Sequence, residues 1–145
     1  KEDLHALVNN AGIFIPGPAE WLSMNDYRRI FDVNVFGAIY TTLELLPALG
    51  RNKESKGRIV NMSSISATVH GPFLSAYSSS KAAIDMFSSC LRVETGRNIS
   101  VHQIMPSGFR TPLLGMENMR SMIERLWDNV PAQVREDYGE SYKED

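Results

Sequence analysis

Three short apolar runs, each ending at a turn, predict three β-strands along the chain. The runs extend from Leu4 to Val8, from Arg58 to Met62 and from Ile99 to Met105. Polar residues, a glycine or a proline follow each run, which is typical of a strand that leaves a sheet. Long segments of helical periodicity lie between the runs, so strands and helices are expected to alternate.

The first helical segment lies between the first two strands, and apolar residues recur along it at every third or fourth position. Ser23 and Asp26 form a capping-box-like pattern at its start, and Gly50 suits its C-terminal end. We therefore expect one long helix that is disturbed near Gly37 and Pro47.

Two further helical segments are predicted in the second half of the chain. One runs from Ala76 to about Glu94, between the second and third strands. The other precedes an acidic tail and carries Met116, Met119 and Met122 on one side. Because methionine adapts to irregular surfaces, these side chains are either a lid over an apolar substrate or part of the core.

The alternation of strands with long helices indicates an α/β fold, with a parallel sheet and helices on both faces. Binding sites in such sheets lie beyond the carboxyl ends of the strands. Three stretches occupy predicted strand ends, namely residues 9–12 (Asn-Asn-Ala-Gly), Ser63-Ser64, and Pro106 to Thr111. They are expected to meet at one edge of the sheet, beside the start of the Ala76 helix.

Composition and charge narrow the possible partners. The 145 residues, 43% hydrophobic and 22% charged, suit one domain with a buried core. The net charge of −2 contains no block of one sign, which argues against a nucleic-acid partner. No apolar run reaches the roughly 18 residues that a membrane span needs, so no span is expected in this segment.

The cysteine and histidine positions favour no metal site. Cys90 is the only cysteine, so no internal disulfide can form and a reducing compartment is the simpler expectation. We expect a cytoplasmic protein, and association with an organelle or membrane through a preceding segment is the open alternative. His5, His70 and His102 show no metal-ligand spacing with each other or with Cys90. We expect the histidines to be structural or exposed, with His70 an open candidate for the mouth of a substrate site.

Tyr77 and Lys81 stand four residues apart at the start of the Ala76 helix. Residues at this spacing share a helix face. The pair is therefore either a surface tyrosine beside a solvated lysine, or a phenol whose proton a neighbouring cation makes easier to remove. The spacing alone leaves both interpretations open.

Five motifs in order resemble those of the short-chain dehydrogenases/reductases of the NNAG-bearing type. They are LVNNAG, DVNVFG, GRIVNMSS, YSSSK and PSGFRT, and together they cover essentially the whole chain. The stretch MIERLWDNVPAQVREDYG further resembles the retinol and hydroxysteroid dehydrogenase branch. The resemblance implies a Rossmann-type, doubly wound sheet and an oxidoreductase that uses NAD or NADP.

The resemblance implies four catalytic residues in this sequence. Tyr77 matches the general acid/base, and Lys81 matches the lysine that favours phenolate and holds the cofactor ribose. Ser64, thirteen residues before Tyr77, matches the serine that binds the substrate oxygen. Asn34 matches the asparagine that extends a proton relay to the lysine through a water.

Less specific interpretations of these polar residues stay open. Ser63 and Ser66 neighbour Ser64, and each hydroxyl has a simpler role in forming a turn. The family spacing makes us prefer Ser64 as the substrate-binding serine. Asn34 is alternatively a polar residue that only bends the helix.

The resemblance also implies two cofactor-binding segments beside Tyr77 and Lys81. They comprise Asn10, Ala11 and Gly12 after the first strand, and Pro106, Gly108, Phe109 and Thr111 after the third. Part of the role of the first segment is to stabilise the sheet. The family usually has glycine after the proline of the second segment, whereas this chain has Ser107, which restricts the backbone of this loop more than glycine does.

The glycine-rich phosphate-binding pattern of the fold is not found in these 145 residues. We therefore expect residues 1–145 to be the C-terminal, catalytic part of a dinucleotide-binding domain, with 112–145 as a substrate-lid or C-terminal segment. The expected substrate is an apolar alcohol or carbonyl compound, retinoid-like or steroid-like, and the family favours a homodimer. The alternative is a non-catalytic piece that serves at most in interaction or dimerisation.

Overall fold

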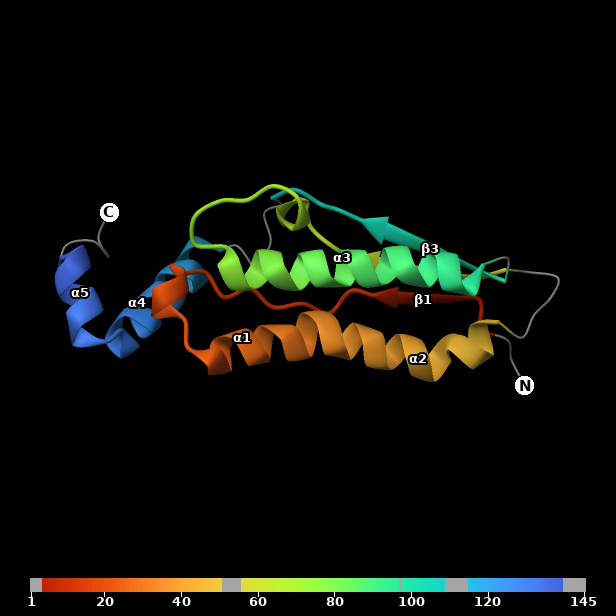
Figure 1. Cartoon of the computed structure of the whole chain (residues 1–145), viewed down its shortest axis with the longest axis horizontal. Helices are drawn as coiled ribbons and strands as arrows, with labels where there is room; N and C mark the ends of the chain where they lie inside the picture. The colour runs from red at the N-terminus through yellow and green to blue at the C-terminus, as the bar shows by residue number, and fades with distance from the viewer. Residues whose placement is uncertain (1–3, 51–55, 97, 109–114, 140–145) are drawn as a thin grey trace.

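The computed structural model describes residues 4–50, 56–96, 98–108 and 115–139. Within them, three parallel strands form one sheet in the order β1-β2-β3 (Figure 1). The strands are β1 (Ala6–Asn9), β2 (Gly57–Met62) and β3 (Ile99–Ile104). The α-helices are α1 (Met24–Phe31), α2 (Ala38–Leu49), α3 (Ser75–Thr95), α4 (Met116–Asn129) and α5 (Ala132–Tyr138). The shorter turns are η1 (Ala19–Trp21), η2 (Asp32–Gly37) and η3 (Ile65–Ala67).

The predicted strands and long helices are confirmed, with small shifts at their ends, and α5 lies in the stretch expected to be an acidic tail. The capping box is present, because Asp26 N–H donates to Ser23 Oγ and Ser23 N–H donates to Asp26 Oδ2. The expected disturbance near Gly37 is the π-helical turn η2, which joins α1 to α2. Pro47 lies inside α2 without ending it.

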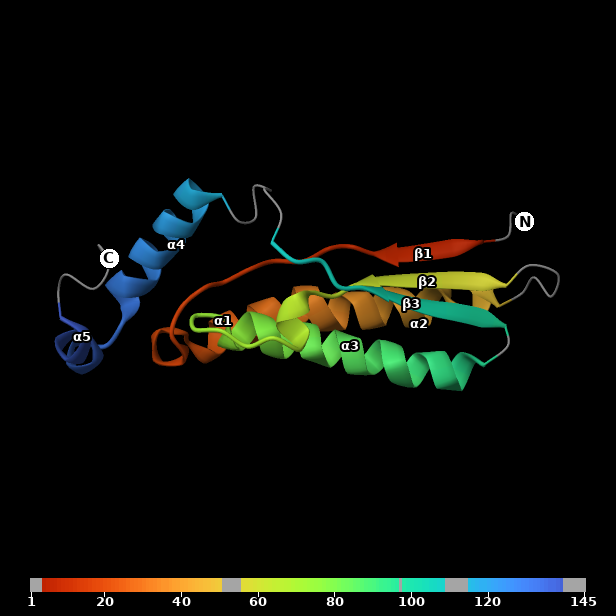
Figure 2. The same cartoon turned by 90° about the horizontal axis from the view of Figure 1, so that it is seen from above.

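The two helices that pack on the sheet, α2 and α3, lie on the same face of it (Figure 2). For the described residues, this corrects the expectation of helices on both faces. Alternate β2 residues Gly57, Ile59 and Asn61 are buried on that face. The strand order explains the arrangement. Successive right-handed crossovers that move in one direction across a sheet place their connecting helices on the same side.

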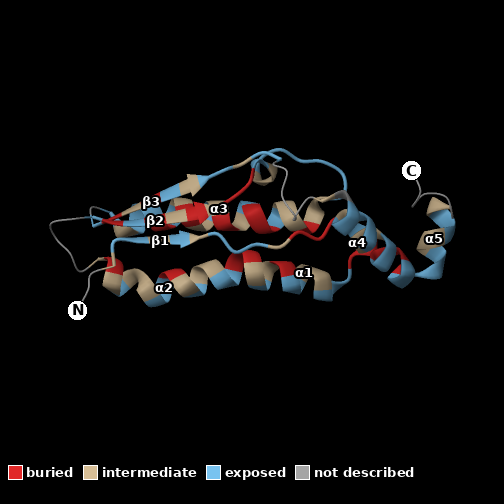
Figure 3. Cartoon of the chain, turned by 180° about the vertical axis from the view of Figure 1, so that it is seen from behind, coloured by how far each residue is buried: buried red, intermediate tan, exposed pale blue. Residues whose placement is uncertain are grey.

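The core below the sheet forms where α2 and α3 meet the strands. Ile59 at its centre is fully buried among Leu49, Leu91, Ile99 and Val101. On the opposite face, residues of β1 and β3 such as Val8 are exposed (Figure 3). The buried residues therefore lie along the side of the sheet that the helices cover.

A row of buried and half-buried polar side chains also joins the sheet to both helices. Asn9 Nδ2 donates to Thr42 Oγ1 of α2 at 2.9 Å and to Asn61 Oδ1 at 2.8 Å. Asn61 Nδ2 in turn donates to Ser88 Oγ of α3 at 2.7 Å. These hydrogen bonds satisfy amides that would otherwise be costly to bury. The sequence pattern predicted the strands but not this row.

The C-terminal helices pack on η1 beyond the end of the sheet. Trp21 lies edge-on to Trp127 at a ring separation of 4.9 Å, and Leu126 and Val130 complete a buried cluster with them. Met119 and Met122 are half-buried outside this cluster, so the interpretation of these methionines as core is not supported. The side chain of Met116 lies outside the described residues. Among the described helices, none is long and apolar enough to cross a membrane.

We predict that Gly57→Ala destabilises the fold. A Cβ at this position would lie 2.5 Å from the Leu49 carbonyl oxygen and 3.0 Å from its carbon, so the α2 backbone would have to move. The expected loss in the free energy of unfolding, measured by urea denaturation, is about 1–3 kcal/mol.

Gly71→Ala is the matched control, because its added Cβ would meet only the Leu74 side chain at an ordinary 3.5 Å. Equal stabilities of the two variants would show that β2 and α2 are not packed as described.

Candidate active site

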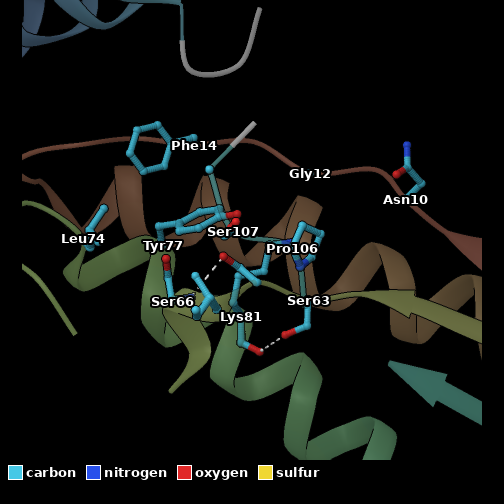
Figure 4. A pocket seen from close by; sticks show the side chains of 13 residues that line it. Asn10, Gly12, Phe14, Ser63, Ser66, Leu74, Tyr77, Lys81, Pro106 and Ser107 are labelled. Atoms are coloured by element: carbon cyan, nitrogen blue, oxygen red, sulfur yellow. Dashed lines mark hydrogen bonds between the residues drawn. The ribbon is translucent and has the colours of Figure 1, made fainter. Parts of the chain in front are cut away.

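The carboxyl ends of the three strands open onto a pocket of about 420 Å³ (Figure 4). The backbone holds the ends of β2 and β3 together, since Ser63 N–H donates to the Ile104 carbonyl at 2.8 Å and Ile65 N–H donates to the Pro106 carbonyl at 3.0 Å. The pocket is lined by Asn10, Gly12, Phe14, Ser63, Ser64, Ile65, Ser66, Leu74, Tyr77, Lys81, Pro106, Ser107 and Gly108. The predicted convergence of the three stretches is thus confirmed for their described residues, which end at Gly108 in the third stretch.

Tyr77 and Lys81 occupy successive turns at the start of α3, on the face that lines the pocket. The Tyr77 ring is half-buried and meets the ring of Phe14 edge-on, with centroids 5.0 Å apart. Lys81 Nζ lies 5.7 Å from the centre of the same tyrosine ring. The surface interpretation of this pair is therefore wrong.

The Lys81 ammonium is buried at the floor of the pocket, with only 5% of the residue exposed. Its Nζ donates a hydrogen bond to the Met62 carbonyl at 2.8 Å, at the last residue of β2. Burial removes water from the charged amine and lowers the pKa of Lys81 below its ordinary value of 10.5.

Asn34 lies buried in the π-helical turn η2 and contacts the segment that follows β1. Its Oδ1 accepts a hydrogen bond from Ile13 N–H at 2.8 Å, and its Nδ2 donates to the Ile13 carbonyl at 3.0 Å. A Cβ on the neighbouring Gly12 would lie 3.5 Å from both Asn34 Oδ1 and Lys81 Nζ. Asn34 therefore does more than bend the helix, because it fixes the backbone beside Lys81.

The three candidate serines make different contacts. Ser64 Oγ accepts a hydrogen bond from Ser66 N–H at 3.2 Å, which leaves the hydroxyl proton of Ser64 available to an oxygen in the pocket. Ser63 Oγ instead donates to the Lys81 main-chain carbonyl at a long 3.5 Å. All three side chains line the pocket.

The predicted cofactor residues divide between two recesses. Asn10 lines both the pocket and a second recess of about 330 Å³ beside β1, and Ala11 lines only the second. Pro106 and Gly108 line the main pocket. The two remaining predicted residues, Phe109 and Thr111, lie outside the described residues.

Sequence reasoning missed the apolar wall of the pocket. Phe14, Ile65 and Leu74 line it, although each lies in a segment that the sequence identified only as a loop. A bulky aromatic two residues after Gly12 was the available signal for Phe14. His70 is exposed and does not line the pocket, and no described cluster of His, Cys, Asp or Glu could hold a metal ion.

Comparison with known proteins identifies the family. A model of the short chain dehydrogenase family matches residues 2–121. Human 17-beta-hydroxysteroid dehydrogenase type 2 is 42% identical over 96% of this chain and 36% of its own length. The 3beta-hydroxysteroid dehydrogenase dhs-16 of Caenorhabditis elegans is 38% identical over 98% of this chain and 36% of its own length.

A solved structure agrees with these sequence matches. The 3-ketoacyl-(acyl-carrier-protein) reductase of Brucella melitensis, complexed with NADH, superimposes with a TM-score of 0.74 at 29% identity, over 90% of this chain and 61% of the reductase. The chain spans between 36% and 45% of the length of these curated relatives and of the mouse short-chain dehydrogenase/reductase family 9C member 7. The motifs, the fold and these matches agree that the chain belongs to the short-chain dehydrogenase/reductase family.

Proposed function

We propose that the protein is an oxidoreductase that transfers a hydride between a nicotinamide cofactor and an alcohol or carbonyl substrate. The observation that carries the proposal is the meeting of Tyr77, Lys81 and Ser64 in one pocket at the carboxyl edge of the sheet. A proton donor, a cation and a second hydroxyl donor there match the needs of carbonyl reduction and of its reverse.

Tyr77 acts as the general acid/base in this proposal. Its phenol gives a proton to the carbonyl oxygen during reduction and takes one from the alcohol during oxidation. The Lys81 ammonium lies beside the same ring, with Nζ 5.7 Å from the ring centre, and so places a positive charge next to the group that exchanges the proton. Ser64 donates its hydroxyl to the substrate oxygen and stabilises the negative charge that develops on it.

The pocket residues fit NAD or NADP at the Lys81 end. Lys81 supplies a cationic donor for ribose hydroxyls, and Gly12 leaves open the space that a side chain would fill beside it. Asn10, Ala11, Pro106 and Gly108 would hold other parts of the cofactor. The nicotinamide supplies or accepts the hydride when the cofactor is bound.

An apolar substrate fits the rest of the pocket. Phe14, Ile65 and Leu74 present carbon surface around the polar group formed by Tyr77 and Ser64. Such a site binds a large apolar molecule and orients it through one oxygen. The names of the human and nematode relatives, both hydroxysteroid dehydrogenases, further support the steroid-like of the two expected substrate types.

A homodimer is the proposed assembly. Phe36, Tyr40 and Leu43 form a stripe along η2 and α2, and Met86 and Val93 lie on α3; each of these five residues is more than half exposed. Apolar stripes on two neighbouring helices suit an isologous contact with a second copy of the chain.

Tyr77→Phe is expected to lower kcat by about 10²- to 10⁴-fold in the naturally expressed protein, because only the acid/base hydroxyl is deleted. Steady-state kinetics with NADH and NADPH measure the effect. Tyr27→Phe is the control, since its hydroxyl bonds Ser75 Oγ at 2.9 Å and does not line the pocket. Near-normal turnover in Tyr77→Phe would remove Tyr77 from the mechanism and overturn the proposed function.

The burial of Lys81 predicts a pH-dependent stability. Its folded-state pKa lies below 10.5, so in the window between that lowered value and 10.5 the unfolded chain binds more protons than the folded one. The free energy of unfolding of the natural protein should therefore rise with pH through this window, relative to Lys81→Met. Urea denaturation across alkaline pH tests the slope.

Lys56→Met is the control for this experiment, because Lys56 is exposed and should produce no such change in slope relative to the natural protein. A difference between the natural protein and Lys81→Met that does not vary with pH would show that Lys81 is solvated rather than buried.

Tyr40→Glu should convert the proposed dimer to a monomer, because it places a charge in the middle of the apolar stripe. Light scattering at micromolar concentration measures the molecular mass in solution and so distinguishes dimer from monomer. Met24→Glu is the control, an equally exposed apolar residue at the far end of the helical segment. A natural protein that is already monomeric would contradict the dimer.

A further inference from the structure

Ser80 is a fully buried hydroxyl directly before Lys81. It lies within the YSSSK motif, but neither the family resemblance nor the proposed mechanism gives it a role. Its Oγ donates to the Tyr77 main-chain carbonyl at 2.7 Å. The same oxygen accepts a hydrogen bond from Asn34 Nδ2 at 3.0 Å. Ser80 thus joins the first turn of α3 to the π-helical turn η2.

The proton balance at Ser80 determines which way the Asn34 amide points. Because the hydroxyl proton of Ser80 is committed to a carbonyl, its oxygen can only accept from Asn34, so Nδ2 must face it. The Ile13 N–H selects the same orientation from the other side, since it requires Oδ1. With both partners in place, Asn34 Oδ1 lies on the Gly12 side, beside the space that Lys81 Nζ borders.

We propose that Ser80 is a positioning residue for the reaction, which acts by holding the Asn34 carbonyl oxygen toward Lys81. Without the Ser80 hydroxyl, Asn34 keeps only its two hydrogen bonds to the Ile13 main chain, and the buried amide is held less tightly. A loosened Asn34 amide in turn loosens the backbone of Gly12 and Ile13 that borders the Lys81 ammonium. The inference rests on the proposed function, because it assigns Ser80 a role in that reaction.

The same helix provides a matched control. Ser88 is also fully buried, donates to a main-chain carbonyl one turn back at 2.7 Å, and accepts from an asparagine Nδ2, that of Asn61. Ser88 does not line the pocket, and its asparagine lies within the sheet. Replacing either serine by alanine therefore deletes a similar pair of hydrogen bonds. Only the pair made by Ser80 involves residues next to the pocket.

The first experiment measures hydrogen exchange of the asparagine side-chain amides by NMR, in the protein as it is naturally expressed and without cofactor. Ser80→Ala should accelerate exchange at the Asn34 amide by about tenfold and leave the Asn61 amide unchanged, whereas Ser88→Ala should do the reverse. Unchanged exchange at Asn34 in Ser80→Ala would overturn the inference.

The second experiment compares kinetics of the same variants. Ser80→Ala should lower kcat by roughly tenfold, with KM for the substrate changed less than about twofold. Ser88→Ala should leave both kcat and KM unchanged. In an Asn34→Ala background, Ser80→Ala should have no further effect on kcat, because the two residues act as one unit. An equal loss of kcat in both backgrounds would contradict the inference.

The outcomes separate the two proposals. If Tyr77→Phe abolishes turnover while Ser80→Ala keeps full kcat, the role of Ser80 is wrong and the proposed function stands. If Tyr77→Phe stays active, the proposed function fails, and the exchange data alone still decide whether Ser80 holds Asn34. Should Ser80→Ala not fold, Ser80→Cys fills the site with a weaker hydrogen-bonding group, and the same criteria apply to it.

Discussion

The structure depends on the burial of one ammonium group, that of Lys81. A buried charge is costly unless its donors are satisfied, and in the folded chain Nζ donates to the Met62 carbonyl at the end of β2. This contact requires α3 to pass directly beneath the carboxyl edge of the sheet. The position of α3 in turn brings Tyr77, one turn earlier, to the pocket, so one constraint places both residues.

Asparagine side chains that are buried or half-buried also hold the structure together. Asn9 and Asn61 join neighbouring strands to each other and to the helices below, and Asn34 joins the π-helical turn to the segment after β1. Each amide offers donors and an acceptor in a fixed geometry, so it specifies one arrangement of its neighbours in a way that an apolar contact does not. The sheet and the site are thus held by hydrogen bonds where apolar packing alone would allow small shifts.

The arrangement of layers follows from strand order. The helices cover one face of the sheet, and the other face carries exposed apolar residues such as Val8 and Ile104. A doubly wound sheet has helices on both sides only where the strand order reverses. The three described strands follow one another across the sheet in chain order, β1-β2-β3, without a reversal. The expectation of helices on both faces therefore holds for the fold family but not for the described residues.

The sequence by itself determined the elements and the main chemistry of the site. Alternating apolar runs and helical periodicity are local properties, which is why β1, β2, β3 and the long helices could be predicted with only small errors at their ends. The motifs around Ser64, Tyr77 and Lys81 likewise indicated which residues meet, because strand ends in a parallel sheet share one edge.

Tertiary structure decided which side chains complete the site. Phe14 reaches the Tyr77 ring, and Ser80 reaches Asn34, across separations of 63 and 46 residues for which no periodic signal exists. The burial that lowers the pKa of Lys81 likewise arises only when β2 and the loops close over α3. Contacts of this kind depend on how the elements pack, and packing is a property of the whole fold rather than of any local stretch of sequence.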